Sequence, residues 1–433
     1  MRYATITTLL LLGGAGTTAA QEEEAGQVRV LSLDECVAIA LENNPGLAIA
    51  AQRERASEAG LQGAASAYFP RVEVRSSYQL TRSRGGRRVI PGVGVIQFAG
   101  QIAEPDVHGL YLTQTILQTG RTDAVRQARH EARADKHATA DVRRELIDAV
   151  AAQYYVVLAN RRLLEVAQES AAFEDENVRI VQGRIDVGAA APVDVRPALT
   201  RRAQAQLEVV RAENAVELAL AQLKNIIGLP PTSRIDVAES LQEEAREVNL
   251  EDALQEAYER RPDLAEQEER VRAAKYALRI ARARALPQLV VTGESAYDLL
   301  DAVPAFTYEF AASARYPIFD GGSARAEVDA AKANLRAAKA QLEQVRLTVG
   351  LEVENAVLSV REAAARIQAA RTAVQEAQAN FEAMQGRLQE GLVTTQDVTE
   401  AEVALTNARV QEVQAIYDLN VALTALDAAI GRQ

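Results

Sequence analysis

Apolar residues recur at alternating spacings of three and four from Val328 to Leu388, and none of these positions is polar. This spacing is typical of a long helix that packs along its length against other helices. Two spacings of four follow one another only at Val345, Val349 and Val353, a stutter that relaxes the left-handed supercoil. The segment contains no proline, so about 60 residues at about 1.5 Å each predict a rod on the order of 90 Å. The proline-free stretch from Arg121 to Ile185 predicts a second long helix.

Short segments beside these helices alternate between apolar and polar residues, which predicts β-strands. Alternation over about 10 residues, with aromatic residues near the ends, is typical of a strand that spans an outer membrane. We therefore expect one face of these strands to contact lipid. A small soluble hairpin is the alternative, but it would bury little apolar surface and leave its edges unpaired. The residues expected to face lipid are Val72, Val74, Tyr78, Leu289, Val291, Phe306, Tyr308, Phe310 and Tyr316.

The sequence repeats its own landmarks in order. Leu33–Pro45 recurs as Leu250–Pro262, and Gly188–Val195 recurs as Gly391–Val398. The offset between the copies is smaller at the second pair of landmarks than at the first, so the second copy is shorter, and the deficit lies in the loop between its strands. We predict a signal peptide at residues 1–20 and two structural repeats, 21–247 and 248–433. In the first repeat we expect strands at about 70–81 and 107–118 and helices at 121–187 and 192–228; the second of these strands alternates poorly. In the second repeat we expect strands at about 287–299 and 305–318 and helices at 323–389 and 395–430.

The amino terminus has the layout of a secretory signal. Arg2 precedes an apolar stretch, Ala4–Leu12, and small residues lead to a plausible cut after Ala20. No later segment has the roughly 18–20 continuous apolar residues of a spanning helix. The single cysteine, Cys36, cannot form an internal disulfide and lies too far from the cut for a lipid anchor, so we expect a packed side chain.

Charge and composition exclude several functions. A net charge of −12 is unfavourable for nucleic-acid binding, which needs clustered basic surface. The sequence has no phosphate-binding glycine loop and no discernible nucleophile–base pair, so we expect neither an enzyme nor a bound cofactor. His130 and His137 share a helix face, but no third ligand accompanies them, and we expect no metal site.

Several motifs carry a resemblance to a known family. They are the Leu33–Pro45 opening and its second copy, Tyr68-Phe69-Pro70 before the first strand, and Tyr316-Pro317-Ile318-Phe319-Asp320-Gly321-Gly322 after the last. With these motifs, nearly the whole mature chain resembles the TolC-like outer-membrane efflux proteins.

The resemblance implies a mainly α fold with a membrane β-barrel. Three copies, each giving four strands, would form one twelve-stranded barrel in outer-membrane lipid, and their coiled-coil helices would form an α-helical barrel in the periplasm. It also implies a homotrimer whose periplasmic end opens when an inner-membrane pump and its periplasmic adaptor dock.

Two tight turns join the long helices to the helices that follow, at Gly183–Pro192 and Gly386–Gln396. The resemblance implies that small exposed residues at these turns dock the adaptor. The alternative is that the glycines only end their helices. The residues concerned are Val187, Gly188, Gly391 and Leu392.

Two acidic residues follow the second turn. Asp397 and Glu400 are three positions apart at a helix start, so both project from one face. The resemblance implies that they ring the narrowest part of the tunnel, where a threefold axis would gather six carboxylates and favour cations. The alternative is that they only complement the helix dipole.

The family also ties the aspartate of the first turn, here Asp194, to a tyrosine and an arginine of the second copy. The matching positions hold Leu388 and Val393, which cannot make that link. We expect either that Asp194 pairs with Arg184 or Arg387, or that the resting gate is looser.

These features together predict a trimeric exit duct for small molecules or proteins. The alternative from another class is a soluble periplasmic coiled-coil scaffold or adaptor. A single-chain porin is poorly compatible with so few strands and so much helix.

Overall fold

The computed structural model describes residues 28–78, 81–82, 85–98, 102–103, 106–238, 246–284, 286–298 and 306–432. The expected signal peptide lies outside them. The chain forms two compact units, one of residues 1–51, 139–262 and 346–433 and the other of residues 52–138 and 263–345. Among the described residues, none of the helices has the length and apolar character needed to traverse a bilayer.

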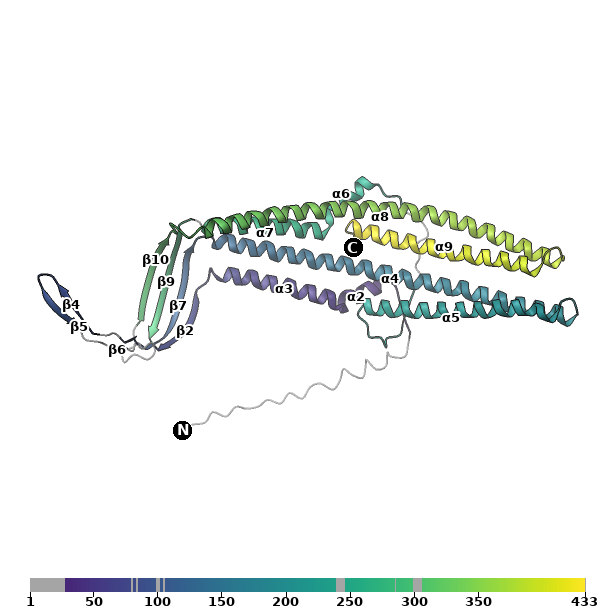
Figure 1. The fold of residues 1–433 in the computed structure, drawn as a ribbon, viewed down its shortest axis with the longest axis horizontal. Coiled ribbons are helices and arrows are strands. Elements are labelled where there is room, and N and C mark those ends of the chain that lie inside the picture. The colour runs from purple at the N-terminus through teal and green to yellow at the C-terminus, as the bar shows by residue number, and fades with distance from the viewer. Residues whose placement is uncertain are drawn as a thin grey trace, which may run out of the picture. The chain divides into compact units, whose positions relative to one another are not determined.

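The chain is mainly helical, and one order of elements occurs twice, which confirms the expected fold class and internal duplication (Figure 1). The first copy contains α2 (Leu33–Asn43), α3 (Pro45–Ser66), β2 (Arg71–Tyr78), β7 (Asp106–Gln118), α4 (Arg121–Asp186), the 3-10 turn η2 (Pro192–Asp194) and α5 (Val195–Ile226). The second contains α6 (Leu250–Arg260), α7 (Pro262–Arg284), β9 (Gln288–Asp298), β10 (Phe306–Arg315), α8 (Ser323–Gln389) and α9 (Thr395–Ala429). Between β2 and β7 the first copy adds β3 (Thr81–Arg82), β4 (Gly86–Ile90), β5 (Gly94–Phe98) and β6 (Ile102–Ala103).

Four strands form one antiparallel sheet in the order β10-β9-β7-β2. Opposed residues of an antiparallel pair lie on the same face, so the register assigns each position to a face. Val72 opposes Leu112, and the same row ends at Tyr308 on β10. One face gathers Val72, Val74, Leu110, Leu112, Leu289, Val291, Phe306, Tyr308 and Phe310, and the other gathers Arg71, Glu73, Thr113, Thr292, Glu294 and Glu309.

Two details of the sheet differ from the simple strands expected. The register shifts between Thr115 and Leu117, and this bulge moves the apolar positions of β7 from even to odd numbers, which explains its poor alternation. β10 ends at Arg315, so Tyr316 lies beyond the strand in which we expected it; Pro317, which follows, has no N–H for a ladder. Tyr78 is the last residue of β2, and its side chain lies outside the described part.

The burial of α8 confirms the apolar seam read from the sequence. Every seam position from Val349 to Ala370 is buried, whereas seam positions nearer the two ends of the helix are half-buried. Phe381 of the seam packs against Phe173 of α4 with ring centroids 5.5 Å apart. Near both ends of α8, therefore, the apolar side chains of the seam are only partly buried by the rest of the chain.

A small core anchors the start of the first copy. β1 (Arg29–Leu31) pairs in parallel with β8 (Ile235–Val237). The fully buried Tyr154 donates its hydroxyl to the carbonyl of Ala238 at 2.5 Å. Cys36 is fully buried in the same core, which confirms the packed side chain expected, and burial raises the pKa of its thiol to about 11.

In each copy the helix that follows the tight turn, α5 or α9, is called here the returning helix. It ends beside the residue that separates the first two helices of its copy. Asn44, between α2 and α3, donates from Nδ2 to the carbonyl of Ile226, the last residue of α5, at 2.8 Å. Arg261, between α6 and α7, donates from Nη1 to the carbonyl of Ala429, the last residue of α9, at 3.3 Å. The final carbonyls of a helix have no partner inside the helix, so these two equivalent positions satisfy them.

A glycine follows each of these helix ends. Gly228 and Gly431 both have a φ of 76°, the left-handed conformation that commonly terminates helices. A Cβ at Gly228 would lie 2.7 Å from the carbonyl oxygen of Asn43, and one at Gly431 would lie 3.3 Å from the carbonyl carbon of Arg260. The left-handed backbone conformation therefore favours glycine at both positions, and at Gly228 the contact with Asn43 also leaves no room for a Cβ.

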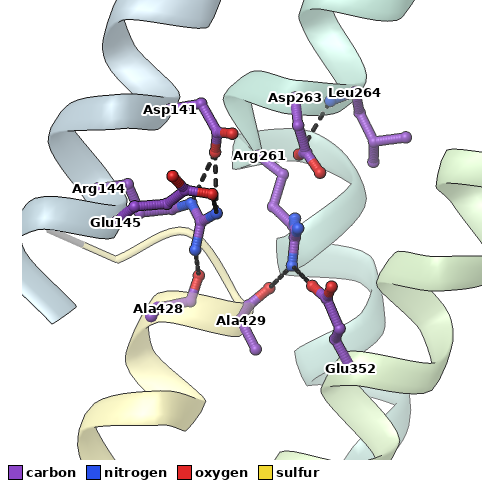
Figure 2. A network of polar contacts seen from close by, with 9 residues as sticks. All are labelled: Asp141, Arg144, Glu145, Arg261, Asp263, Leu264, Glu352, Ala428 and Ala429. Carbon is purple, nitrogen blue, oxygen red and sulfur yellow. Dashed lines mark hydrogen bonds and ion pairs between the residues drawn. The ribbon is translucent and has the colours of Figure 1, made fainter. Parts of the chain in front are cut away.

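The end of α9 carries an additional polar network, which Figure 2 shows. The Arg261 side chain is only 3% exposed and forms an ion pair with Glu352 of α8 at 2.5 Å. Arg144 of α4 donates to the carbonyl of Ala428 at 3.3 Å and pairs with Asp141. Two cations at a helix carboxyl end also complement its dipole.

We expect Arg261→Met to lower the free energy of unfolding by about 2 kcal/mol, because the buried end of α9 loses a hydrogen bond and the exposed Glu352 loses its ion-pair partner. Thermal unfolding followed by circular dichroism measures this. The matched control is Arg260→Gln, since Arg260 forms an ion pair with Glu256 but is 58% exposed; its effect should stay within about 0.5 kcal/mol. Equal effects of the two substitutions would contradict the buried role of Arg261.

Candidate functional site

The two turns between long and returning helices have the same backbone hydrogen bonds. Each contains a glycine with positive φ, 75° at Gly188 and 74° at Gly391. The glycine N–H donates to the carbonyl three residues earlier, and the next N–H donates to the carbonyl five residues earlier, that of Arg184 or Arg387. This is the Schellman arrangement, so both glycines do end their helices.

Apolar side chains project from these turns into solvent. Val187 is 79% exposed and Leu392 is 69% exposed. Each of these apolar residues is exposed on a turn of defined backbone geometry. The four residues expected at the tip therefore lie on two similar, accessible turns.

Asp194 and Asp397 occupy equivalent positions in the two copies; Asp194 caps the 3-10 turn η2, and Asp397 caps α9. Asp194 accepts from the N–H of Ala191 at 2.9 Å. Asp397 accepts from the N–H and the hydroxyl of Thr394, each at 2.7 Å, in a capping box. The Thr394 hydroxyl, followed by its N–H, lowers the pKa of Asp397, because both stabilise the ionised carboxylate.

Asp397 and Glu400 are both exposed on the first turns of α9, while Val398 and Thr399 between them are buried. Glu400 accepts from Nε2 of Gln396 at 3.1 Å. The structure thus brings the two carboxylates together on one outward side of the helix. Pairing of Asp194 with Arg184 or Arg387 stays a prediction, since in the single chain Asp194 bonds the turn backbone.

Arg201 is a residue that the sequence reasoning missed. It lies on α5, donates from Nη1 to Oε1 of Gln396 at 3.4 Å and forms an ion pair with Glu174 of α4 at 3.6 Å. It therefore connects three helices beside the acidic pair of α9. The signal in the sequence is modest: Arg201 stands two helical turns after Asp194, on the same face.

Glu402 is a second missed residue. It is buried on α9, accepts from the Thr406 hydroxyl at 2.8 Å, and faces Glu174, which is buried on α4. Burial raises the pKa of Glu402, the nearby Glu174 adds to this, and the hydroxyls of Thr406 and Ser170 and the charge of Arg409 oppose it. The sequence signal was an acid at an apolar spacing, four residues after Val398 and three before Leu405.

The apolar face of the sheet is open to solvent in the single chain. Its most exposed residues are Phe310, at 79%, and Val74, at 74%. An apolar sheet face of this size is unfavourable in water. Val72, Leu289, Phe306 and Tyr308 are also exposed, and Val291 is half-buried.

We expect Glu402→Gln to change how stability depends on pH. Because the pKa of Glu402 is raised by folding, the folded chain keeps this proton to higher pH than the unfolded chain, so stability falls as pH rises from the ordinary glutamate pKa to the raised one. The variant lacks this loss, so its melting temperature should exceed that of the wild type at about pH 8 and approach it near pH 4. The exposed Glu390→Gln is the control, and identical pH profiles for wild type and Glu402→Gln would contradict the assignment.

Comparisons with known proteins cover most of the chain. A family model described as outer membrane efflux protein matches residues 37–229 and 253–432. The pyoverdine export outer membrane protein OpmQ of Pseudomonas aeruginosa is 26% identical over 316 residues, which are 72% of this chain and 65% of that protein. The protein CyaE of Bordetella pertussis is 25% identical over 409 residues, which are 93% of this chain and 84% of that protein.

Solved structures share the fold at low sequence identity. The outer-membrane channel OprN superposes with a TM-score of 0.79 at 21% identity, over 93% of this chain and 90% of that one. The outer membrane protein VceC of Vibrio cholerae superposes with a TM-score of 0.78 at 19% identity, over 92% of this chain and 96% of that one.

Proposed function

This chain belongs to the outer membrane efflux protein family, and from that premise we propose that three copies form an exit duct that carries small molecules or proteins from the periplasm. Membership confirms the resemblance read from the sequence motifs and the location in the outer membrane. It favours the duct over a soluble periplasmic scaffold. A periplasmic adaptor would bind the periplasmic end of the duct, and an inner-membrane pump would supply the energy for export.

The observation that carries this proposal is the open, two-faced sheet. Its apolar face is exposed in the single chain, and β2 and β10 stand at its edges with one sheet neighbour each. Unpaired strand edges cannot be left in lipid, since the bilayer core offers no water to their N–H and C=O groups. Pairing β10 of one copy with β2 of the next, three times, would close a twelve-stranded barrel.

Exposed apolar side chains on the helices support the same assembly. Leu347, Leu351 and Leu358 are exposed on α8, and Val210 and Leu218 are exposed on α5. A helix with a second apolar stripe can pack against a neighbouring helix on each of two sides, and every helix of a closed α-helical barrel must do so. These stripes would bury against neighbouring copies, and the exposed turn residues Val187, Gly188, Gly391 and Leu392 would remain for the adaptor.

We expect Phe310→Arg to impair insertion, because an arginine on a lipid-facing strand costs about 2–4 kcal/mol near the bilayer midplane. The matched control is Ser313→Arg, which places the same charge on the other face of β10. Recovery of heat-modifiable trimers from the outer-membrane fraction measures the effect. Equal recovery of both variants would contradict a lipid-facing Phe310.

We also propose that Asp397 and Glu400 ring the periplasmic entrance. Capping lowers the pKa of Asp397, so its charge persists at neutral pH. Asp397→Asn with Glu400→Gln should move the potassium-to-chloride permeability ratio in planar bilayers toward one. Glu382→Gln on α8 with Glu390→Gln in the turn after it, both at exposed positions, is the charge-matched control. Unchanged selectivity in the first pair would refute the ring.

A further inference from the structure

One feature of the first copy has no equivalent in the second. β2 ends at Tyr78 and β7 begins only at Asp106, whereas β9 ends at Asp298 and β10 begins already at Phe306. Within the longer connection, β4 and β5 form an antiparallel hairpin, which pairs Gly86–Ile90 with Gly94–Phe98. A hairpin found in one copy only is not required by the duplicated fold, so it calls for a separate explanation.

The charge of this connection is opposite to that of the chain. The connection, residues 79–105, contains four arginines, no lysine and a single acidic residue, Glu104, although the whole chain has a net charge of −12. Arg87 and Arg88 stand in β4 opposite Gln97 and Ile96. With its oxygen turned toward Arg87, the Gln97 amide accepts from Nε at 2.7 Å and Nη2 at 2.9 Å. This cross-strand contact orients the guanidinium and leaves its other edge for an anion.

The turn end of the same hairpin is apolar and exposed. Val89 is 71% exposed and Val93 is 70% exposed, and Ile90, Val95 and Ile96 are exposed as well. The apolar pair Val89–Val95 lies two residue pairs, roughly 7 Å, beyond Arg87. A surface-bound amphipathic segment buries its apolar part about 5–10 Å below the charged headgroups, which matches this separation.

The topology places the hairpin at one end of the sheet. β2 follows α3 and β7 leads into α4, so the β2–β7 connection lies at the strand ends remote from the helices. Resting on the proposed function, in which the helices lie in the periplasm, this end meets the outer leaflet. Packing of three such hairpins on one another is disfavoured, since it would gather the like charges of the β4 arginines.

We propose that the β4–β5 hairpin binds the phosphorylated, negatively charged lipid of the outer leaflet, with Arg87 on a lipid phosphate and the turn at Val93 among the acyl chains. Guanidinium groups suit phosphate because they bind it through two parallel hydrogen bonds. A lipid layer supplies both the anionic and the apolar partner that the hairpin presents.

The chain contains no tryptophan, so Val93→Trp is a single fluorescent reporter. The full-length variant is reconstituted into vesicles of phosphatidylcholine with brominated acyl chains, with or without bisphosphorylated lipid A. We expect bromine quenching of the reporter to increase with lipid A and much less with its dephosphorylated form. Adding Arg87→Gln and Arg88→Gln should raise the lipid A concentration required on the order of 30-fold.

Arg325→Gln with Arg336→Gln, at exposed positions of α8, is the matched control and should leave quenching unchanged. Three outcomes would overturn the proposal. The first is quenching that is the same with and without the lipid A phosphates, or with and without Arg87 and Arg88. The second is reporter emission typical of water in all vesicles, and the third is blue-shifted emission that bromine does not quench, which hairpins packed on one another would give. Trimer recovery and conductance are measured on the same vesicles. Their loss would count against the duct itself, whereas normal conductance with an unquenched reporter would overturn only the lipid contact.

Discussion

The end of each returning helix is fixed by one side chain at a break between two short helices, and this contact sets the register of everything beyond it. Asn44 holds the end of α5, and Arg261 holds the end of α9. A glycine in the left-handed conformation follows each end and terminates the helix there. Because α9 is one continuous helix from Thr395 to Ala429, fixing its last carbonyl also fixes which residues face outward at its first turn. The placement of Asp397 and Glu400 depends on a contact about eight or nine helical turns away.

The two copies share backbone contacts and differ in charged side chains. The turn hydrogen bonds, the aspartate caps and the terminal glycines recur at equivalent positions, because any chain that reverses there needs them. Asn44 is a neutral cap, whereas Arg261 also forms an ion pair with Glu352. Leu199 stands where the second copy has Glu402, and the arginine-bearing hairpin belongs to the first copy only. The shared features explain the fold, and the departures are where function-specific chemistry is concentrated.

Periodicity predicted what depends on neighbours along the chain. The seam of α8 was read correctly because every third or fourth residue reports the same helix face, and the apolar face of the sheet because strands alternate. The bulge at Thr115–Leu117 hid the pattern of β7, and Pro317 ended β10 before Tyr316. Arg201 and Glu402 were missed because their partners lie on other helices, and no spacing along one helix reports which residue a second helix will bring opposite. The β4–β5 hairpin was missed because short exposed strands lack a buried face to impose a period.

The polar contacts of α9 differ in length between its carboxyl end and its amino end. At its carboxyl end, Arg261 and Arg144 reach the last carbonyls while Arg261 contacts Glu352 at 2.5 Å. At its amino end, Arg201 reaches Gln396 at 3.4 Å and Glu174 at 3.6 Å, and the neighbouring carboxylates Glu402 and Glu174 are buried facing each other. Long polar contacts and opposed buried acids hold two helices together more weakly than a short ion pair from a buried arginine does. If the acids of α9 ring the entrance, the helix is held firmly where it is remote from them and loosely where they lie. Opening at the turns would then require only the weaker set of contacts to change.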